Sequence, residues 1–579
     1  MIDMNADELT NETVAAIFAA MGDMLDIQDA GIHRILAYRR AAETVASLGR
    51  PIAEVWRAGE LEDLPGIGKT LAAKIDELMR TGELAAYQKL QAEVPAGVVD
   101  MLRISGVGPK RAALFWRELG LTSVEELDNA ARAGRLQALP GLGAKTEARL
   151  LASIAALHRQ SQRTLLGTAG PLAQEMLGEL EQAPGVTQSA VAGSLRRMRE
   201  TVGDVDLLVA AAEAEPVMAA FRGLNHVAEV LLGGETKTSV RTHQGFQVDL
   251  RVLDASRWGT ALQYFTGSQA HNVRLRELAL SRGLSLSEYA LKREGSGEIL
   301  CATEDEVYAA LGLPWIPPEL RENHGEIEAA QDGGLPDLVT LADLRGDLHV
   351  HTTTSDGRDG MLEMAEAARA RGFEYLALAD HTHSLGVVRG MTVEDVRAQR
   401  AEIDALNEHF AGSFRLLACA EVEVLSDGNL DFPDEVLAEL DLVIASVHMG
   451  LRQSRERVTA RVIAAIRNPH VDIIAHPTGR LIGQREGADL DLEEVFRAAA
   501  ETGTALEINA YPQRLDLRDI HVRRAIELGV RLAINSDAHH AAGFDVLPFG
   551  VATARRGWAR SADVINTWPL EELLTWTDR

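Results

Sequence analysis

The chain has 579 residues, enough for several domains that each bury a core. Its 46% hydrophobic and 25% charged residues are typical of an ordinary soluble protein. Only two cysteines and an acidic start without a signal peptide exclude a disulfide-rich secreted protein. The sequence has no apolar run of about eighteen residues, so no membrane span is predicted. A net charge of −28 excludes a generally basic protein, so any contact with nucleic acid has to be local. We therefore expect a cytoplasmic protein with no membrane partner.

One motif occurs three times in the first third of the chain, as LPGIGKTLAAKI, ISGVGPKRAALF and LPGLGAKTEARL. Each copy places Gly-x-Gly before a stretch that predicts an amphipathic helix, so the backbone can turn tightly and its amides can face a phosphate. This resembles the helix-hairpin-helix motif, which holds DNA backbones without reading sequence. For a single copy a plain turn before a helix would be the better explanation, but three copies favour DNA, and residues 101–150 carry 8 Lys/Arg against 5 Asp/Glu. The candidate residues are Gly66, Gly68, Gly106, Gly108, Gly141, Gly143 and Lys110, with Lys69, Lys74, Arg111 and Lys145 nearby.

Two strand-like runs in the mixed region 186–313, VDLLVAA and FQVDLRVL, carry Asp206 and Asp249, and Asp204 directly precedes the first run. Asp204 and Asp206 are two residues apart, so on a strand their carboxylates share one face and repel unless a cation lies between them. With Asp249 on the second run they predict an all-oxygen site for two Mg²⁺ ions. The alternative is a pair of solvated acids on a surface strand, which a lone D-x-D would favour. Upstream, amides, a hydroxyl and a guanidinium suited to a triphosphate are supplied by Gly193, Ser194 and Arg197.

The last part of the chain follows a stretch rich in Pro, Gly and acid, whose residues 321–345 predict a linker that lets the two halves fold independently. Seven strand–helix steps then predict an α/β barrel, in which polar side chains at the carboxyl ends of the strands form the site. The first of these strands carries alternating Asp347, His349 and His351, which would share one face.

Histidines concentrate in this last part, since residues 347–540 hold 11 of the chain's 17. A lone histidine is more often structural, but a whole set at matching strand ends would leave an unpaired polar cluster without metal. Imidazoles with carboxylates suit zinc, manganese or iron better than calcium. The candidate ligands are His349, His351, Asp356, His381, Glu421, His448, His476, Asp537 and His539.

The segments GSLRRMRETVGDVDLL and YFTGSQAHNVRLR resemble the family X DNA polymerases, which have a nucleotidyltransferase fold. The resemblance implies that Asp204, Asp206 and Asp249 are catalytic and hold two Mg²⁺ ions. It also implies a nucleotide pocket made by Gly193, Ser194, Arg197, Gly203, Tyr264, Phe265, Gly267 and Asn272, with Arg276 near the template strand.

The segments IHRILAYRRAA and LPGIGKTLAAKIDELMRTGEL resemble the small amino-terminal domain of the same family. In relatives with 5′-deoxyribose-phosphate lyase activity, the Schiff-base lysine falls at Lys74 and a helping tyrosine at Tyr38. Glu62 and Asp63 stand where relatives are basic, and an ordinary exposed helix lysine explains Lys74 about as well. The lyase activity therefore stays open.

The segments DLHVH, ALADHTHS, AEVEV, SVHMG, AHPTG and NSDAHH resemble, in order, the PHP domain, the polymerase and histidinol phosphatase family, over nearly all of 340–579. The resemblance implies a site for up to three metal ions, Mn²⁺ or Zn²⁺. His383 and His540 match no ligand position. The implied ligand sets are His349, His351, Glu421 and Asp537 for one metal, Glu421, His448 and His476 for a second, and Asp356, His381 and His539 for a third.

The combined resemblances indicate the bacterial family X architecture: a helical helix-hairpin-helix region, an α+β nucleotidyltransferase palm and a carboxy-terminal PHP domain with a distorted α/β barrel. We expect a lyase-like helical domain, a fingers-like region with two hairpin motifs, the palm, a nucleotide- and template-side subdomain, the linker and the nuclease domain. Their expected bounds are 1–95, 96–165, 166–260, 261–320, 321–345 and 346–579.

The predicted function is a DNA-directed DNA polymerase that fills short gaps in DNA repair, such as base-excision repair, with a metal-dependent 3′–5′ exonuclease in the PHP domain. Its expected partners are gapped or primer-template DNA and deoxynucleoside triphosphates, and we expect a monomer. Two alternatives stay open. In one, the PHP domain is a phosphoesterase for a small ester and the front half only docks it on DNA; in the other, the chain is a DNA-end scaffold with weak polymerisation.

Overall fold

The computed structural model describes residues 9, 11–46, 48, 52–104, 106–140, 142–143, 146–151, 153–154, 163–293, 297–385 and 389–578. Gly141 and Lys145, both predicted to lie at the third hairpin, fall outside the described residues. The chain divides into two compact units, residues 1–163 and 164–579.

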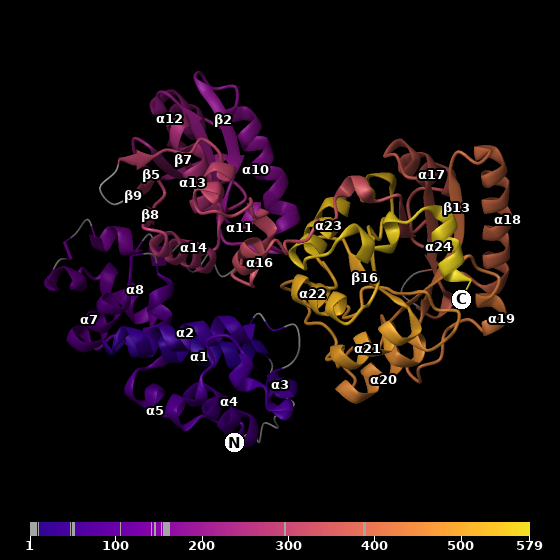
Figure 1. Ribbon diagram of the computed structural model, residues 1–579, viewed down its shortest axis with the longest axis horizontal. Helices are drawn as coiled ribbons and strands as arrows, with labels where there is room; N and C mark the ends of the chain where they lie inside the picture. The colour runs from indigo at the N-terminus through magenta and orange to yellow at the C-terminus, as the bar shows by residue number, and fades with distance from the viewer. Residues whose placement is uncertain are drawn as a thin grey trace. The chain divides into compact units, whose positions relative to one another are not determined.

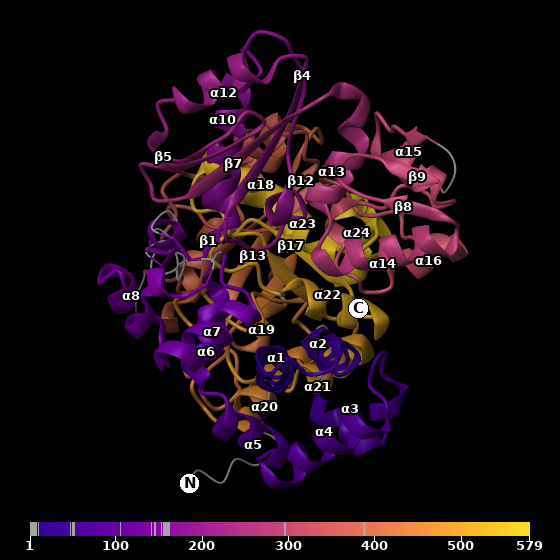
Figure 2. The ribbon, with the colours of Figure 1, turned by 90° about the vertical axis from the view of Figure 1, so that its left-hand side faces the viewer.

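The first unit is helical, as its repeated pattern predicts. Helices α1 and α2 lie side by side in both views (Figures 1 and 2), and the rings of Phe18 and Tyr38 meet between them with centroids 5.8 Å apart. Its helices include α1 (Asn11–Ile27), α2 (Ile32–Ala46), α3 (Ile52–Ala58), α4 (Lys69–Thr81), α5 (Ala85–Glu93), α6 (Ala96–Asp100), α7 (Pro109–Leu119) and α8 (Val124–Arg132).

The first two Gly-x-Gly copies form a turn that leads directly into a helix. Gly66 and Gly106 have positive φ values of 78° and 86°, which glycine adopts without the steric cost that a Cβ adds. Gly68 and Gly108 are the N-caps of α4 and α7, and neither helix has a side-chain cap on its first amides. These amides are therefore available to a phosphate, as the motif predicts.

The second unit begins with a mixed five-stranded sheet of order β2-β4-β7-β6-β5, in which only β4 and β7 run parallel. Alternate residues of β4 enter two different cores, with Leu207 and Val209 against α10 and α12 and Leu208 against α13. The sheet is therefore covered on both faces. Its elements are β1 (Thr164–Leu165), α10 (Leu166–Leu180), β2 (Val186–Val191), α11 (Gly193–Arg196), β3 (Thr201–Val202), β4 (Val205–Ala211), α12 (Ala214–Arg222), β5 (Val227–Gly233), β6 (Lys237–Thr242), β7 (Gln247–Leu253) and α13 (Trp258–Thr266).

A small subdomain follows, and it extends through the stretch 321–345 that we expected to be an open linker. Arg321 and Glu326 in this stretch are fully buried, and Ile327 joins the apolar core of the subdomain. Composition alone predicted a linker because the charged residues of this stretch are buried only through partners elsewhere in the subdomain. Arg321 pairs with Glu304, and Glu326 pairs with His271. The elements are α14 (Gln269–Ser281), β8 (Leu284–Leu286), β9 (Leu291–Arg293), β10 (Glu298–Ile299), α15 (Glu304–Ala310) and α16 (Glu326–Asp332).

The rest of the unit is the predicted α/β barrel, a parallel sheet of seven strands in chain order, β11 to β17. The first and last strands meet, since the Asp537 amide donates to the His349 carbonyl at 3.0 Å and the His351 amide to the Ala538 carbonyl at 2.9 Å. Helix α18 packs along β13 on the outside (Figure 1). The elements are β11 (Gly346–Val350), α17 (Met361–Ala370), β12 (Tyr375–His381), α18 (Val393–Phe410), β13 (Arg415–Glu423), α19 (Asp434–Leu437), β14 (Leu442–Ser446), α20 (Arg455–Ile466), β15 (Ile473–Ile474), α21 (Leu492–Thr502), β16 (Ala505–Asn509), α22 (Asp519–Glu527), β17 (Leu532–Asn535), α23 (Leu547–Arg556) and α24 (Leu570–Thr577).

Side chains such as Leu348, Ala379, Cys419 and Ile444 form a separate apolar cluster on the barrel strands, and α24 contributes Leu573 to it. The strands are thus held by a packed core, and their carboxyl ends are left for polar residues. Among the described residues, no helix is both long enough and apolar enough to cross a membrane.

Candidate active sites

The predicted histidine set comes together at the carboxyl ends of the barrel strands, around Glu421 near the end of β13. Glu421 is 1% exposed. Its Oε1 lies 3.1 Å from His476 Nε2 and 3.5 Å from His448 Nε2, and its Oε2 lies 2.7 Å from His381 Nδ1 and 3.4 Å from His349 Nε2. One carboxylate therefore faces imidazoles from β11, β12 and the loops after β14 and β15, which is the position of a ligand shared between two cations.

His349 on β11 and His351 directly after it point at each other, with His351 Nε2 3.1 Å from His349 Nε2 and 3.1 Å from Asp537 Oδ1. Around Asp356, His539 Nε2 lies 3.3 Å and His381 Nε2 3.8 Å from Oδ2, and His351 Nδ1 lies 3.8 Å from Oδ1. All nine residues of the predicted set are thus placed in one continuous cluster.

The charges in this cluster shift its pKa values strongly. Burial by itself would raise the pKa of Glu421, but the imidazoles of His381 and His349 outweigh burial and hold it well below its usual value. Burial likewise opposes the ionisation of Asp356, yet the hydrogen bond from His539 and the nearby imidazoles bring its pKa to about 2. Burial and the neighbouring His381 lower the pKa of His351 to about 4. Among the imidazoles, His351 is neutral, whereas at His349, His381 and His539 burial is outweighed by the facing carboxylates, which raise the pKa; a bound cation would take the place of those protons.

The residues fit a metal. His351 Nδ1 is buried without a hydrogen-bond partner, which is costly unless another group binds it. Two facing imidazole nitrogens are also unfavourable unless they share a proton or a cation. Three groups of side chains have ligand atoms within 4.8 Å of one another: His351, Asp356, His381 and His539; His349, His351 and Glu421; and His381, Glu421 and His448.

Two carboxylates that we did not predict fix the orientation of these imidazoles. Glu507 Oε1 lies 2.7 Å from His349 Nδ1, and Glu423 Oε2 lies 2.8 Å from His448 Nδ1, so each histidine presents Nε2 to the site. The sequence did hold a signal: Glu423 lies two residues after Glu421, and Glu507 lies in the strand-like run ALEINA. Asp347, by contrast, accepts the backbone amides of His349 and Ser536 and does not face the imidazoles.

The three aspartates of the mixed sheet also lie together. Asp206 on β4 and Asp249 on β7 are direct neighbours across the parallel pair, and Asp204 precedes β4. Burial and the charges of Asp204 and Asp249 raise the pKa of Asp206 to about 7. A cation between these carboxylates would relieve the repulsion, and Lys237, whose Nζ lies 2.6 Å from Asp249 Oδ2, already neutralises part of it.

Gly193 allows the α11 turn to approach these carboxylates. Its φ is +62°, and a Cβ there would clash with Asp206 Oδ2. The Ala192 amide also donates to the Asp206 carbonyl at 2.8 Å. Ser194 lies in α11, and Gly203 lies between β3 and β4.

The other residues predicted for nucleotide binding make contacts within the protein. Arg197 directly follows α11, and its guanidinium donates to the Thr266 carbonyl at 2.7 Å and to Glu322 at 3.1 Å. Asn272 donates to the Tyr264 carbonyl at 2.7 Å and accepts from Gln263 at 2.9 Å. These bonds join α11 to the predicted sugar-side segment, in which the Tyr264 and Phe265 rings meet edge to face beside Gly267; Arg276 donates to the Asn272 carbonyl at 3.2 Å.

In the first unit, Lys74 is half-buried on α4 and Tyr38 is buried in the helical core. Lys110 lies exposed in the first turn of α7, whereas Arg111 donates to the Gly106 carbonyl at 2.6 Å and supports the turn. Both basic residues at this turn are therefore exposed to solvent, and Arg111 also supports the turn.

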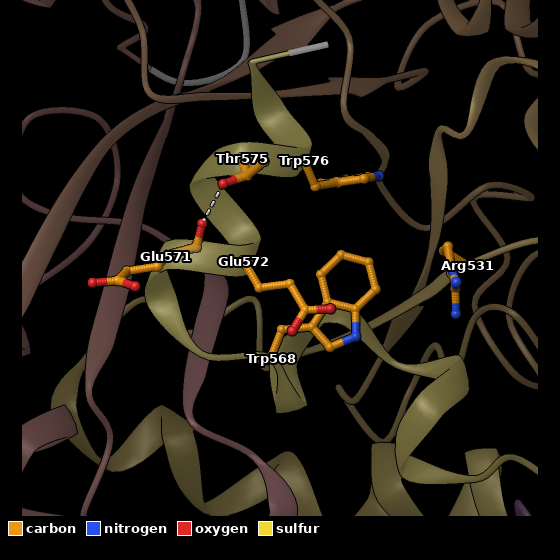
Figure 3. Close-up of a pocket in the computed structure, with 6 residues that line it drawn as sticks. All are labelled: Arg531, Trp568, Glu571, Glu572, Thr575 and Trp576. Carbon is orange, nitrogen blue, oxygen red and sulfur yellow. Dashed lines mark hydrogen bonds between the residues drawn. The ribbon is translucent and has the colours of Figure 1, made fainter.

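A shallow pocket of about 480 Å³ lies between α24 and Arg531, the residue before β17 (Figure 3). It contains none of the predicted site residues. Two tryptophans and two acids contribute to its lining, which consists of Arg531, Trp568, Glu571, Glu572, Thr575 and Trp576.

Four family profiles match the chain in an order that follows the fold. A helix-hairpin-helix domain matches residues 9–84, a SAM-like helix-hairpin-helix tandem 98–156, a DNA polymerase beta thumb 261–322 and a PHP domain 347–511.

Some similar proteins match nearly the whole chain, and others match a part of it. The "DNA polymerase/3′-5′ exonuclease PolX" of Bacillus subtilis is 39% identical over 97% of this chain and 97% of its own length. The "DNA polymerase lambda" of Rattus norvegicus is 26% identical over 50% of this chain and 52% of its own length. A "probable phosphatase" of Thermoanaerobacter sp. is 31% identical over 34% of this chain and 80% of its own length.

Proposed function

Because this chain belongs to the family X DNA polymerases with a carboxy-terminal PHP domain, we propose that it fills short gaps in DNA with its mixed sheet and removes 3′-terminal nucleotides with its barrel. The observation that carries this proposal is the presence of two separate clusters of potential metal ligands, each on its own set of strands. The three aspartates lie on β4 and β7, and the histidine cluster lies on the barrel.

In the mixed sheet, Asp204, Asp206 and Asp249 would hold two Mg²⁺ ions, which activate the 3′-hydroxyl of the primer and stabilise the leaving pyrophosphate of a deoxynucleoside triphosphate. An all-oxygen ligand set favours Mg²⁺. The chain's own contribution is placement: Gly193 lets the α11 turn reach Asp206, and Lys237 pairs with the buried carboxylate of Asp249.

In the barrel, the nine clustered residues would hold up to three ions, which generate a hydroxide near neutral pH and stabilise the leaving oxygen of a phosphodiester. Imidazole-rich coordination favours Mn²⁺ or Zn²⁺ over Mg²⁺. Glu507 and Glu423 orient His349 and His448, and the low pKa of Asp356 keeps that carboxylate ionised at neutral pH.

The test is primer extension across a one-nucleotide gap in Mg²⁺, with and without a 5′-phosphate, beside degradation of labelled strands in Mn²⁺. We expect filling of the gap in Mg²⁺ and loss of 3′-terminal nucleotides in Mn²⁺. The similarity of the barrel to a probable phosphatase supports one alternative, a phosphoesterase for small esters. Hydrolysis of p-nitrophenyl phosphate without degradation of DNA would establish that alternative and contradict the nuclease.

A further inference from the structure

Arg556, the last residue of the barrel helix α23, lies among groups from both the barrel and the polymerase part of the second unit. Its side chain is only 4% exposed. Its Nε donates to Asp519 of the barrel at 2.8 Å, and its Nη1 donates to the Arg197 carbonyl at 2.7 Å and to Glu322 at 3.0 Å. A guanidinium holds several acceptors in one plane at fixed angles, so these contacts fix the groups relative to one another.

The acceptors of Arg556 lead directly to the predicted nucleotide pocket. Glu322 also accepts from Arg197 Nε at 3.1 Å, and Arg197 Nη1 donates to the Thr266 carbonyl at 2.7 Å. Arg197 closes the α11 turn beside Asp206, and Thr266 precedes Gly267 of the sugar-side segment. One continuous set of hydrogen bonds therefore connects a barrel helix to both sides of the pocket.

The charges in this set are matched. Arg556 and Arg197 are two buried cations, and Glu322 and Asp519 are the carboxylates that accept from them. Burial disfavours ionisation of Asp519, but Arg556 and the neighbouring arginines outweigh burial and keep its pKa far below the usual value. If Arg556 is removed, two partly buried carboxylates and the Arg197 carbonyl lose a donor, and the α11 turn has to find a new arrangement.

We propose that Arg556 of the barrel is a positioning residue for nucleotide addition, because it holds the Arg197 turn and Glu322 in the arrangement that binds the incoming triphosphate. This inference rests on the proposed polymerase function. It makes the barrel part of the polymerase pocket's framework, so that nucleotide affinity depends on a residue far along the chain from the aspartates. Arg556 does not belong to the histidine cluster, so strand degradation should not depend on it.

The test uses the full chain with Arg556→Gln and Arg556→Lys, and with Arg555→Gln as the matched control. Arg555 is the neighbouring arginine on the same helix; it pairs with Glu319 at 2.7 Å and donates to the Val339 carbonyl. We expect Arg556→Gln to raise the KM for the nucleotide in gap filling by about tenfold or more, with a smaller effect on kcat, since displaced binding groups weaken capture of the substrate. Arg556→Lys should fall between the parent and Arg556→Gln, because one ammonium cannot reproduce the planar set of donors. Arg555→Gln should keep the KM of the parent.

Two further readouts separate positioning from general loss of structure. The rise in Tm that a deoxynucleoside triphosphate with Mg²⁺ gives the parent should shrink in Arg556→Gln, whereas the rate of strand degradation in Mn²⁺ should stay within about twofold of the parent. If Arg556→Gln does not fold, Arg556→Lys decides the question by the same readouts. An unchanged KM in a folded Arg556 variant, an equal rise in Arg555→Gln, or a parallel loss of degradation would overturn the inference. A parent that adds no nucleotide would instead overturn the proposed function itself.

Discussion

Glu507→Gln tests whether the carboxylates that orient the clustered histidines, Glu507 and Glu423, set the metal affinity of the barrel. Glu507 Oε1 lies 2.7 Å from His349 Nδ1 and accepts from Asn535 at 2.9 Å, while Oε2 accepts the His476 amide at 2.7 Å. Asn535 and the His476 amide donate to Glu507, and the His349 Nδ1–H needs an acceptor. In either orientation, the NH₂ group of a glutamine would therefore face a donor. If the NH₂ group faces His349, the imidazole proton moves to Nε2, the atom that faces Glu421. Loss of such an outer contact costs about 10- to 100-fold in metal affinity, which is about 1.4–2.7 kcal/mol.

The assay is the Mn²⁺ content of the purified protein after equilibrium dialysis at graded free Mn²⁺, with strand degradation followed at the same concentrations. Saturating Mn²⁺ should restore most of the degradation, because the first ligands remain. Glu493→Gln is the control, since Glu493 is buried like Glu507 but pairs with Arg524 on the outer helices. Unchanged Mn²⁺ affinity in Glu507→Gln, or an equal loss in Glu493→Gln, would refute the reasoning.

Four further changes test other parts of the account. Gly193→Ala should abolish gap filling and spare strand degradation, because a Cβ at φ +62° clashes with Asp206; equal loss of both activities would contradict this. Lys110→Ala should weaken binding about equally on unrelated duplexes and reduce its salt dependence, measured by fluorescence anisotropy, and a sequence-dependent loss would argue against phosphate contact. If Lys74 is the lyase nucleophile, borohydride should trap the parent but not Lys74→Ala on a 5′-deoxyribose-phosphate end, and equal trapping would move the nucleophile elsewhere. Burial and the nearby Arg518 and Arg480 lower the pKa of His521 to about 3, so below about pH 6.5 the unfolded chain binds a proton that the folded chain does not. From pH 7 to pH 5 the free energy of unfolding should therefore fall by up to about 2 kcal/mol more in the parent than in His521→Gln. Urea-unfolding curves that shift equally with pH in the two proteins would contradict this.

The barrel and the gathering of its candidate ligands could be predicted from the sequence because strand periodicity and strand-end chemistry are local. Asp347 and His349 lie on β11 and His351 directly follows it, and the other candidate ligands lie at or after the ends of other strands, so a parallel barrel brings them together once it closes. Asp347 shows the limit of this reasoning, since the same alternation placed a carboxylate that accepts backbone amides.

The outer contacts could not be predicted because they depend on distant pairings. Glu507 meets His349 across 158 residues, and Arg556 meets the Arg197 carbonyl across 359 residues. The stretch 321–345 had the composition of a linker, and only the positions of His271 and Glu304 explain why its charges are buried. Arg197 had the chemistry of a phosphate ligand, but its contacts with Glu322 and Thr266 are visible only in the fold.

The central claim is that one chain carries two separate metal-dependent active sites, and a paired comparison tests it most directly. Asp249→Asn and His351→Ala are each assayed for filling of a one-nucleotide gap in Mg²⁺ and for degradation of a labelled 3′ end in Mn²⁺. We predict that Asp249→Asn loses gap filling and keeps degradation, and that His351→Ala loses degradation and keeps gap filling, because each change removes a ligand from only one of the two clusters. Loss of both activities from a single folded variant, or retention of both, would contradict the claim.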